Sequence, residues 1–182
     1  MAQAWNTGED GYGLQCGPLQ ISFQRYAAPE SGTLSCLPNS LGQLPLGREG
    51  EDRFLLPVGD EEGVWIGLSV LSGLPWRVTV AARLSNGRKE WICGPEAEVA
   101  PMLHLAGIPV DDGHWLALGR CDRGAACGVA NLSFTALPKG RCVGEQEASV
   151  RFLSFTEARR LAPQLRFRPI DRRAGYKGVL LP

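Results

Sequence analysis

The residues of this sequence that could do chemistry are concentrated in residues 110–128, VDDGHWLALGRCDRGAACG. This stretch holds two adjacent carboxylates, one of the chain's two histidines and two of its six cysteines. Such side chains bind zinc or act as nucleophile and base. Zinc needs three or four convergent ligands, however, and His104 and His114 are ten residues apart with a proline between them. Asp111 and Asp112 fit a turn ahead of a strand. The sequence therefore predicts neither a metal site nor a catalytic residue.

Cofactor motifs are also missing from the sequence. It contains no phosphate-binding loop, and the glycines of residues 8–13, GEDGYG, are not followed by a predicted helix. No cofactor is expected.

The same stretch has the pattern of a β-hairpin, because two alternating segments flank the loop DRGAA. If Cys121 lies opposite Cys127, His114 falls on the apolar face of the hairpin. Directly opposed residues of an antiparallel pair lie about 4.5–5.5 Å apart, which a disulfide can span. The sequence thus predicts a Cys121–Cys127 disulfide in an oxidising compartment. In a reducing compartment the cysteines would be small buried hydrophobic residues.

Two tryptophans, Trp65 and Trp115, fall on strand faces predicted to point outward. In the predicted hairpin Trp115 shares its face with Asn131 and Ser133. A flat aromatic ring beside small polar groups can stack on a sugar ring or become buried in a protein interface. These four residues are the candidate ligand or interface residues. The alternative is that another strand, or the loop of residues 27–52, covers the tryptophans.

The elements that would position these residues are β-strands. In residues 76–93, WRVTVAARLSNGRKEWIC, Asn86-Gly87 favours a two-residue hairpin turn that places Trp76 and Trp91 together on the apolar face. Alternation of apolar and polar residues predicts further strands in residues 19–26, 64–71 and 130–137. The sequence therefore predicts an all-β fold, an antiparallel β-sandwich or jelly roll with long Pro/Gly-rich loops and little helix.

The 182 residues are expected to form one domain, 1–182. Residues 27–52 lack periodicity and are rich in Pro, Gly and Ser, which predicts an extended loop or arm. Thr156 could cap a helical turn that ends before Pro163. This turn opens a basic C-terminal segment, residues 156–182.

The chain has no net charge but an uneven charge distribution. Residues 1–63 carry a net charge of −6, residues 64–143 a net charge of +2 and residues 144–182 a net charge of +4. Such a gradient favours head-to-tail association of copies or contact with a polyanion, although a solvated surface has the same pattern. Nucleic acid is not the expected partner, because four acidic residues accompany the bases of the last segment. The arginines of the basic segment are Arg159, Arg160, Arg166, Arg168, Arg172 and Arg173.

Three functions follow from the sequence, in this order. The first is a non-enzymatic structural or interaction subunit of a larger assembly, such as a virion or a secretion apparatus, with protein partners or self-association. The alternative is a secreted or periplasmic carbohydrate- or ligand-binding β-sandwich, and the third is a hydrolase. No apolar stretch has the length of a membrane span, so no membrane insertion is expected. Residues 1–13 have no signal-peptide pattern, although a mature protein after signal removal would look the same. The even number of cysteines favours an oxidising compartment, such as the periplasm or the extracellular space.

Overall fold

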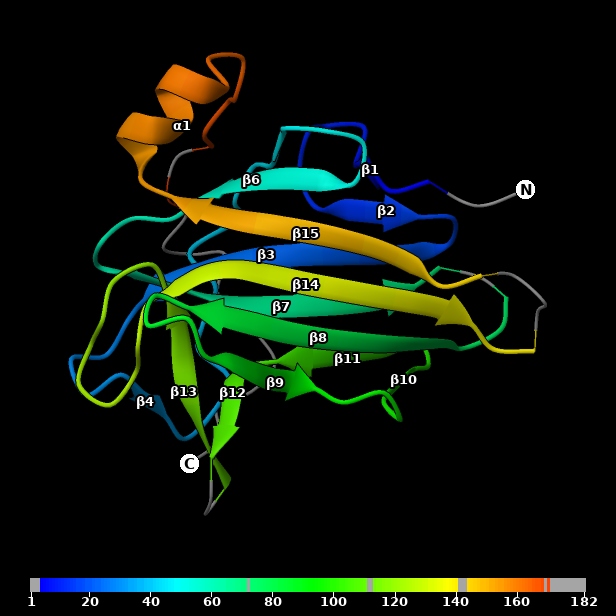
Figure 1. The fold of residues 1–182 in the computed structure, drawn as a ribbon, viewed down its shortest axis with the longest axis horizontal. Helices are drawn as coiled ribbons and strands as arrows, with labels where there is room; N and C mark the ends of the chain where they lie inside the picture. The colour runs from blue at the N-terminus through cyan, green and yellow to red at the C-terminus, as the bar shows by residue number, and fades with distance from the viewer. Residues whose placement is uncertain (1–3, 72, 111–112, 141–143, 169, 171–182) are drawn as a thin grey trace.

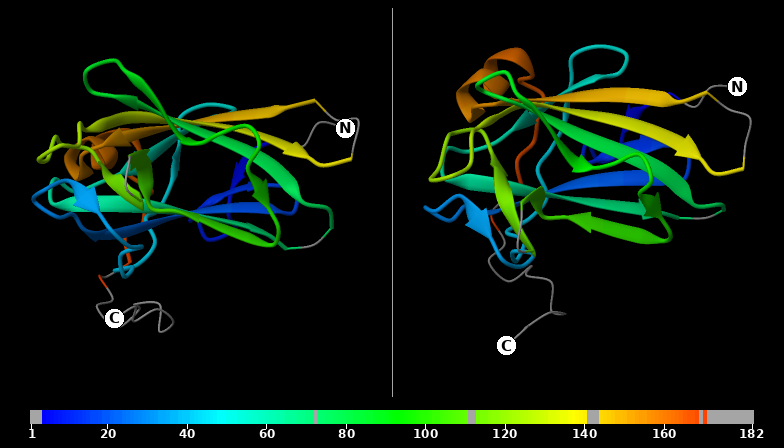
Figure 2. Two further views of the ribbon diagram at one scale, coloured as in Figure 1. Left: turned by 90° about the horizontal axis from the view of Figure 1, so that it is seen from below. Right: turned by 60° about the horizontal axis from the view of Figure 1, so that its bottom comes forward.

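Strands with alternating apolar and polar side chains form two β-sheets that pack face to face (Figure 1; Figure 2). The structure is a computed structural model that describes residues 4–71, 73–110, 113–140, 144–168 and 170. The predicted all-β sandwich is confirmed. The 110–128 hairpin, the register of the 76–93 hairpin and the position of the helix cap differ from the prediction.

The first sheet lies at the back in Figure 1. Its strands follow the order β1–β2–β3–β7–β13–β12, and β11 and β4 pair with β7 and β13 respectively. The β7 strand pairs with β13 through its first residues and with β11 through its last ones. The eight strands are β1 (Asn6–Thr7), β2 (Leu14–Cys16), β3 (Leu19–Ala27), β4 (Thr33–Leu34), β7 (Glu62–Val70), β11 (Met102–Leu105), β12 (Gly107–Val110) and β13 (His114–Gly119).

The second sheet lies at the front in Figure 1 and has the order β10–β8–β14–β15–β6–β5, with β9 paired to β8. All its pairs are antiparallel except β15 with β6. The seven strands are β5 (Gly47–Arg48), β6 (Arg53–Pro57), β8 (Trp76–Leu84), β9 (Lys89–Cys93), β10 (Glu98–Val99), β14 (Val129–Pro138) and β15 (Gln146–Leu153).

The core lies between the two sheets and is formed by the inward residues of each alternating strand. Leu19, Ile21 and Phe23 of β3 point inward and are at most 1% exposed, as the alternation predicts. Phe23 meets Phe134 of the opposite sheet edge to face, with ring centroids 5.9 Å apart. This aromatic pair joins the two layers at the centre of the sandwich.

The 76–93 hairpin forms, but its predicted register is wrong by one residue. Arg83 pairs with Lys89 and Ala81 with Trp91, because the loop has three residues and ends on Gly87 at φ 85°. A one-residue slip moves a side chain to the other face of the sheet. Trp91 is therefore 52% exposed on the outer face. Of the two tryptophans of this hairpin, only Trp76 is buried as predicted.

The predicted 110–128 hairpin is also wrong. The β13 strand belongs to the first sheet and β14 to the second, so β13 and β14 do not pair with each other. Residues 120–128 cross from one sheet to the other and are not the loop of a hairpin. His114 consequently pairs with Val110 of β12. Cys121 and Cys127 are both free thiols, and the described residues contain no disulfide.

The crossing segment is held by Asp122, whose carboxylate accepts hydrogen bonds from the Gly128 amide at 2.6 Å and the Ser85 hydroxyl at 3.1 Å. The Gly128 hydrogen bond, followed by that of Ser85, holds the pKa of the Asp122 carboxyl below its ordinary value. In the unfolded chain these bonds are absent, so Asp122 binds a proton more readily there.

We therefore expect acid to unfold the protein in part through Asp122. Its stabilising contribution is complete above the unfolded pKa, about 3.9, and is lost as the pH falls through the lower folded value. The Asp122→Asn variant should lose less thermal stability than the wild type between pH 7 and pH 3. Thermal unfolding at the two pH values checks this. Equal losses in both proteins would contradict it.

Residues 27–52 do not project as an arm: β4 and residues 41–46 pack along the first sheet, whereas Gly47–Arg48 form β5 of the second sheet. The Leu41 and Leu44 amides donate to carbonyls of β3 at 2.8 Å, beyond the end of β2. Leu44 and Leu46 enter the core and are 0% and 3% exposed. Residues 41–46 thus extend the edge of the sheet that β2 begins.

The helix α1 (Phe155–Leu161) starts two residues earlier than the sequence predicts. Ser154, and not Thr156, is the N-cap, and it forms a capping box with Glu157. The chain after α1 then returns to the first sheet, where the Tyr12 hydroxyl donates to the Arg166 carbonyl at 2.7 Å. Residues 171–182, with Arg172 and Arg173 of the predicted basic segment, lie outside the described residues.

Candidate functional site

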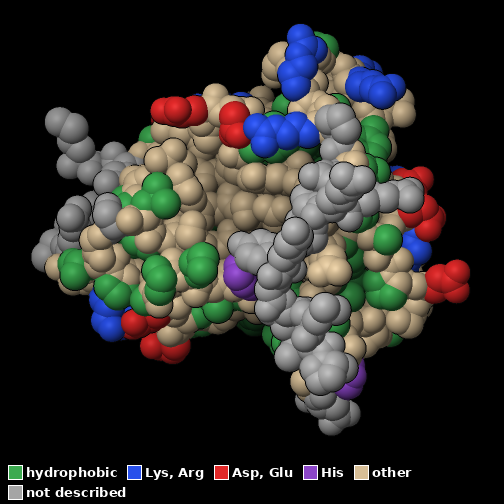
Figure 3. Space-filling view, turned by 180° about the vertical axis from the view of Figure 1, so that it is seen from behind, with side chains coloured by type: hydrophobic (Ala, Val, Ile, Leu, Met, Phe, Trp, Pro, Cys, Tyr) green, Lys and Arg blue, Asp and Glu red, His purple; other side chains and the backbone are tan. Residues whose placement is uncertain are grey.

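The outer face of the first sheet carries a groove of about 700 Å³. Seen from behind in Figure 3, this face is hollowed, and the hollow is mostly uncharged with acidic and basic side chains at its rim. Most lining residues come from β2, β3, β7 and β11 and from the two segments that flank β2 in space, residues 8–13 and Gln43.

Strand alternation explains why the floor of the groove is polar. On β3 the outward residues between the core positions are Gln20, Ser22 and Gln24, and all three line the groove. Their neighbours on β7 are Ser69, Gly67 and Trp65, in that order. A side chain at Gly67 would meet the Ser22 hydroxyl at 2.7 Å, so the glycine keeps the floor open at its centre.

Two glutamines of the groove are available for a ligand. The described part of the chain gives the side-chain amides of Gln20 and Gln43 no hydrogen-bond partner. Gln24, in contrast, accepts a bond from the Ser40 hydroxyl at 2.7 Å, and Gln15 donates to the Gly17 carbonyl at 3.1 Å. Each free amide offers two donors and one acceptor oxygen to whatever occupies the groove.

Aromatic rings border the groove on two sides. Trp65 packs edge to face against His104, with ring centroids 5.4 Å apart. On the other side, the Tyr12 ring lies under the guanidinium of Arg168, 4.3 Å from its centroid. Because Trp65 is only 1% exposed, it offers a ligand no free ring face.

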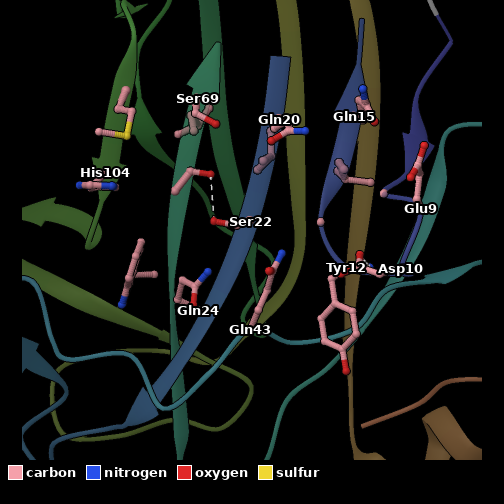
Figure 4. Close-up of a pocket in the computed structure, with 18 residues that line it drawn as sticks. Glu9, Asp10, Tyr12, Gln15, Gln20, Ser22, Gln24, Gln43, Ser69 and His104 are labelled. Carbon is pink, nitrogen blue, oxygen red and sulfur yellow. Dashed lines mark hydrogen bonds between the residues drawn. The ribbon is translucent and has the colours of Figure 1, made fainter. Parts of the chain in front are cut away.

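The titratable residues of the groove lie on opposite sides. Figure 4 shows His104 at one side and Glu9 and Asp10 at the other, with Ser22 and the glutamines between them. The Asp10 carboxylate is occupied, since it binds Arg168 at 2.9 Å and accepts from the Tyr12 amide at 3.1 Å. Among the described residues that line the groove, the two carboxylates, Glu9 and Asp10, therefore lie on the side away from the imidazole.

The structure separates the candidate residues predicted from the sequence. Trp65 lines the groove but is buried, in a small cluster with Tyr26, Leu34, Ala106 and Ala117. Trp115 is half-buried in the same small cluster and does not line the groove. Asn131 and Ser133 lie on β14, on the outer face of the other sheet, so they do not share a face with Trp115.

Sequence reasoning missed most of the groove. The alternation of β3 already placed Gln20, Ser22 and Gln24 on an outward polar face, and this was the available signal. Gln43 and His104 come from segments whose position beside β3 and β7 depends on long-range pairing, for which no local pattern exists.

The arginines of the basic segment also spread over different places. Arg159 and Arg160 are exposed on the last turn of α1, whereas Arg168 is tied to the rim of the groove through Asp10. Arg166 is exposed and contributes its carbonyl to the Tyr12 bond. These four described arginines form no single basic patch.

No metal centre is found in the part of the chain that the structure describes, where no group of three or more His, Cys, Asp or Glu side chains could hold an ion. In the same part of the chain, no helix has both the length and the apolar character to cross a membrane.

The thiols should differ widely in reactivity. Cys36 is exposed, Cys121 and Cys127 are half-buried, and Cys16 and Cys93 are buried. Burial, and secondarily the charge of Asp52, raises the pKa of Cys16 to about 11, and burial also raises that of Cys93. The two buried thiols are therefore poor nucleophiles at neutral pH.

We expect iodoacetamide to label Cys36 first and Cys121 and Cys127 more slowly, all without reductant. Cys16 and Cys93 should react only after denaturation. Peptide mass spectrometry of the native protein over time checks this order. A Cys121–Cys127 peptide that resists labelling until reduction would contradict it.

Comparison of the chain with protein-family models, with curated proteins and with solved structures gave no match.

Proposed function

We propose that this protein is a non-enzymatic binding module that holds a carbohydrate in the groove of the first sheet. The observation that carries the proposal is the uncharged hydrogen-bonding floor, formed by glutamine amides and serine hydroxyls from neighbouring strands. A volume of about 700 Å³ is typical of small-molecule sites, which span about 300–1,000 Å³.

The chemistry of the floor favours a neutral ligand rich in hydroxyl groups. Each sugar hydroxyl both donates and accepts a hydrogen bond. An amide side chain can donate to it through the NH2 group or accept from it through the carbonyl oxygen. The free amides of Gln20 and Gln43 lie on two adjacent segments, so one ligand could be bound from two sides. The described residues that line the groove include no lysine or arginine, and the Arg168 guanidinium at the rim is paired with Asp10, so the groove offers an anionic ligand no unpaired guanidinium or ammonium group.

The separation of the titratable groups supports binding over catalysis. General acid–base chemistry needs an acid and a base within hydrogen-bond reach of the reacting atoms. In this groove His104 and the Glu9–Asp10 pair lie across the floor from each other (Figure 4). The hydrolase alternative therefore gains no support from the site.

Titration calorimetry of the wild type against neutral oligosaccharides of different composition tests the proposal. We expect at least one to bind with a dissociation constant in the range from micromolar to millimolar. Failure of every neutral oligosaccharide to bind would contradict it.

A second candidate function, a subunit of a larger assembly, is favoured by an apolar cluster at one end of the sandwich. Leu71, Leu74 and Met102 are 65%, 50% and 58% exposed there. The Val70 amide binds the Pro101 carbonyl, which keeps the Leu71 and Met102 segments side by side. Light scattering tests this second candidate. An oligomer of the wild type that the Leu71→Asp substitution dissociates would support self-association, and a wild type that is monomeric at all concentrations would count against it.

A further inference from the structure

The outer face of the second sheet is largely open. It faces the viewer in Figure 1, and α1 lies at one end of it. There the helix packs Ala158 and Ala162 on Leu55 of β6 and Leu153 of β15. The rest of the face, across β15, β14, β8 and β9, carries polar residues and one exposed tryptophan.

Cross-strand register aligns small residues into a tract across this face. Trp91 pairs with Ala81, Ala81 with Ser133, and Ser133 with Ser149, which pairs with Arg53. These four steps between neighbouring strands span about 19 Å. The tract therefore runs perpendicular to the strands, with an aromatic side chain at one end and a cation at the other.

A second register row beside the tract is basic. It consists of Lys89, Arg83, Asn131 and Arg151, in that order across the strands. Arg151 is paired with Glu49 at 2.6 Å. Among the described residues no carboxylate forms an ion pair with Arg83, Lys89 or Arg53. The tract is thus bordered by three cations without an acidic partner.

Trp91 adds a stacking surface to these charges. Its side chain is half-exposed, and the Lys89 ammonium lies 4.5 Å from the ring centroid. A ligand that stacks on this ring would meet the ammonium group and the neighbouring guanidinium of Arg83 at the same time. Exposed aromatic rings combined with cations suit ligands that have both an apolar ring face and negative charge.

We propose that this tract binds a linear anionic polysaccharide, one whose sugar rings carry carboxylate groups. The sugar rings would lie over Ser133 and Ser149, whose small side chains are exposed and half-buried, and would pass beside Ala81, which its neighbours leave only 3% exposed, with one ring stacked on Trp91. Their carboxylates would pair with Lys89, Arg83 and Arg53. The proposal is independent of the groove, which lies on the opposite sheet.

Single-stranded nucleic acid has similar charge but fits the tract less well. Its binding sites usually stack several successive bases on several aromatic side chains. Here Trp91 is the only exposed aromatic side chain among the described residues of the tract and the basic row beside it.

The test is fluorescence anisotropy with labelled oligogalacturonate, using a neutral oligosaccharide of the same length and single-stranded DNA as comparators. We expect the wild type to bind oligogalacturonate most tightly, and salt to weaken it. Trp91→Ala and Arg83→Ala should each raise the dissociation constant about tenfold. Arg88→Ala, on an exposed side chain already paired with Glu90, is the matched control and should leave it unchanged.

The groove variant Gln20→Ala/Gln43→Ala separates this proposal from the carbohydrate site of the first sheet. It should bind oligogalacturonate as the wild type does. Three outcomes would overturn the proposal: no binding by the wild type, unchanged affinity in both tract variants, or tighter binding of the DNA. Circular dichroism spectra check that each variant is folded. If Arg83→Ala does not fold, Arg83→Gln takes its place.

Discussion

Replacing Phe134 with alanine is expected to lower the free energy of unfolding by about 3–5 kcal/mol. Phe134 is 1% exposed and meets Phe23 of the opposite sheet edge to face, so its removal leaves a cavity between the layers. For a domain of this size the melting temperature should fall by roughly 6–20 °C. Thermal and urea unfolding measure the effect.

The matched control for Phe134→Ala is Leu161→Ala. Leu161 is 46% exposed on α1, and alanine is a good helix former, so the variant should change stability by less than about 0.5 kcal/mol. Equal losses in the two variants would mean that the pair of Phe23 and Phe134 does not hold the sheets together as described.

Removing the two free amides of the groove is expected to weaken carbohydrate binding. In Gln20→Ala/Gln43→Ala the lost hydrogen bonds should cost about 1–3 kcal/mol together, which raises the dissociation constant roughly 5- to 150-fold. Neither side chain has a hydrogen bond to another described residue, so the melting temperature should change little. Calorimetry against the best-binding neutral oligosaccharide measures the affinity.

The control for the groove variant is Gln146→Ala, which removes a glutamine amide from the second sheet. This side chain donates to the Gly144 carbonyl at 2.9 Å and does not line the groove. Its affinity for the oligosaccharide should equal that of the wild type. An equal loss in both variants, or no loss in the groove variant, would contradict the assignment of the site.

Local sequence patterns predicted the strands well and their partners less well. The alternation of Leu19, Ile21 and Phe23 identified β3 and its inward face, because burial of one face imposes a period of two. Between residues 110 and 128 the same pattern predicted a hairpin. The chain instead crosses to the other sheet there, because β13 pairs with β7 of the first sheet and β14 pairs with β8 of the second. These long-range pairings decide in which layer each strand lies.

The tryptophans show that the predicted face of a strand does not by itself decide whether a side chain is exposed. Trp91 was predicted to be buried and is exposed, because the turn ends on Gly87 in a three-residue loop. Trp65 was predicted to face outward and lines the outer groove, but it is buried in a small cluster with Tyr26 and Leu34. Sequence patterns assign such residues to a strand face, but the loop conformation and the covering segment decide whether that face meets solvent.

The central claim, that the groove of the first sheet is the carbohydrate site, is tested most directly by nuclear magnetic resonance. Amide chemical shifts of the labelled protein are followed while the best-binding neutral oligosaccharide is added. We expect the largest changes to map to the groove, around Gln20, Ser22, Gln43 and Gly67. Changes confined to the second sheet or to the apolar end at Leu71 would contradict it.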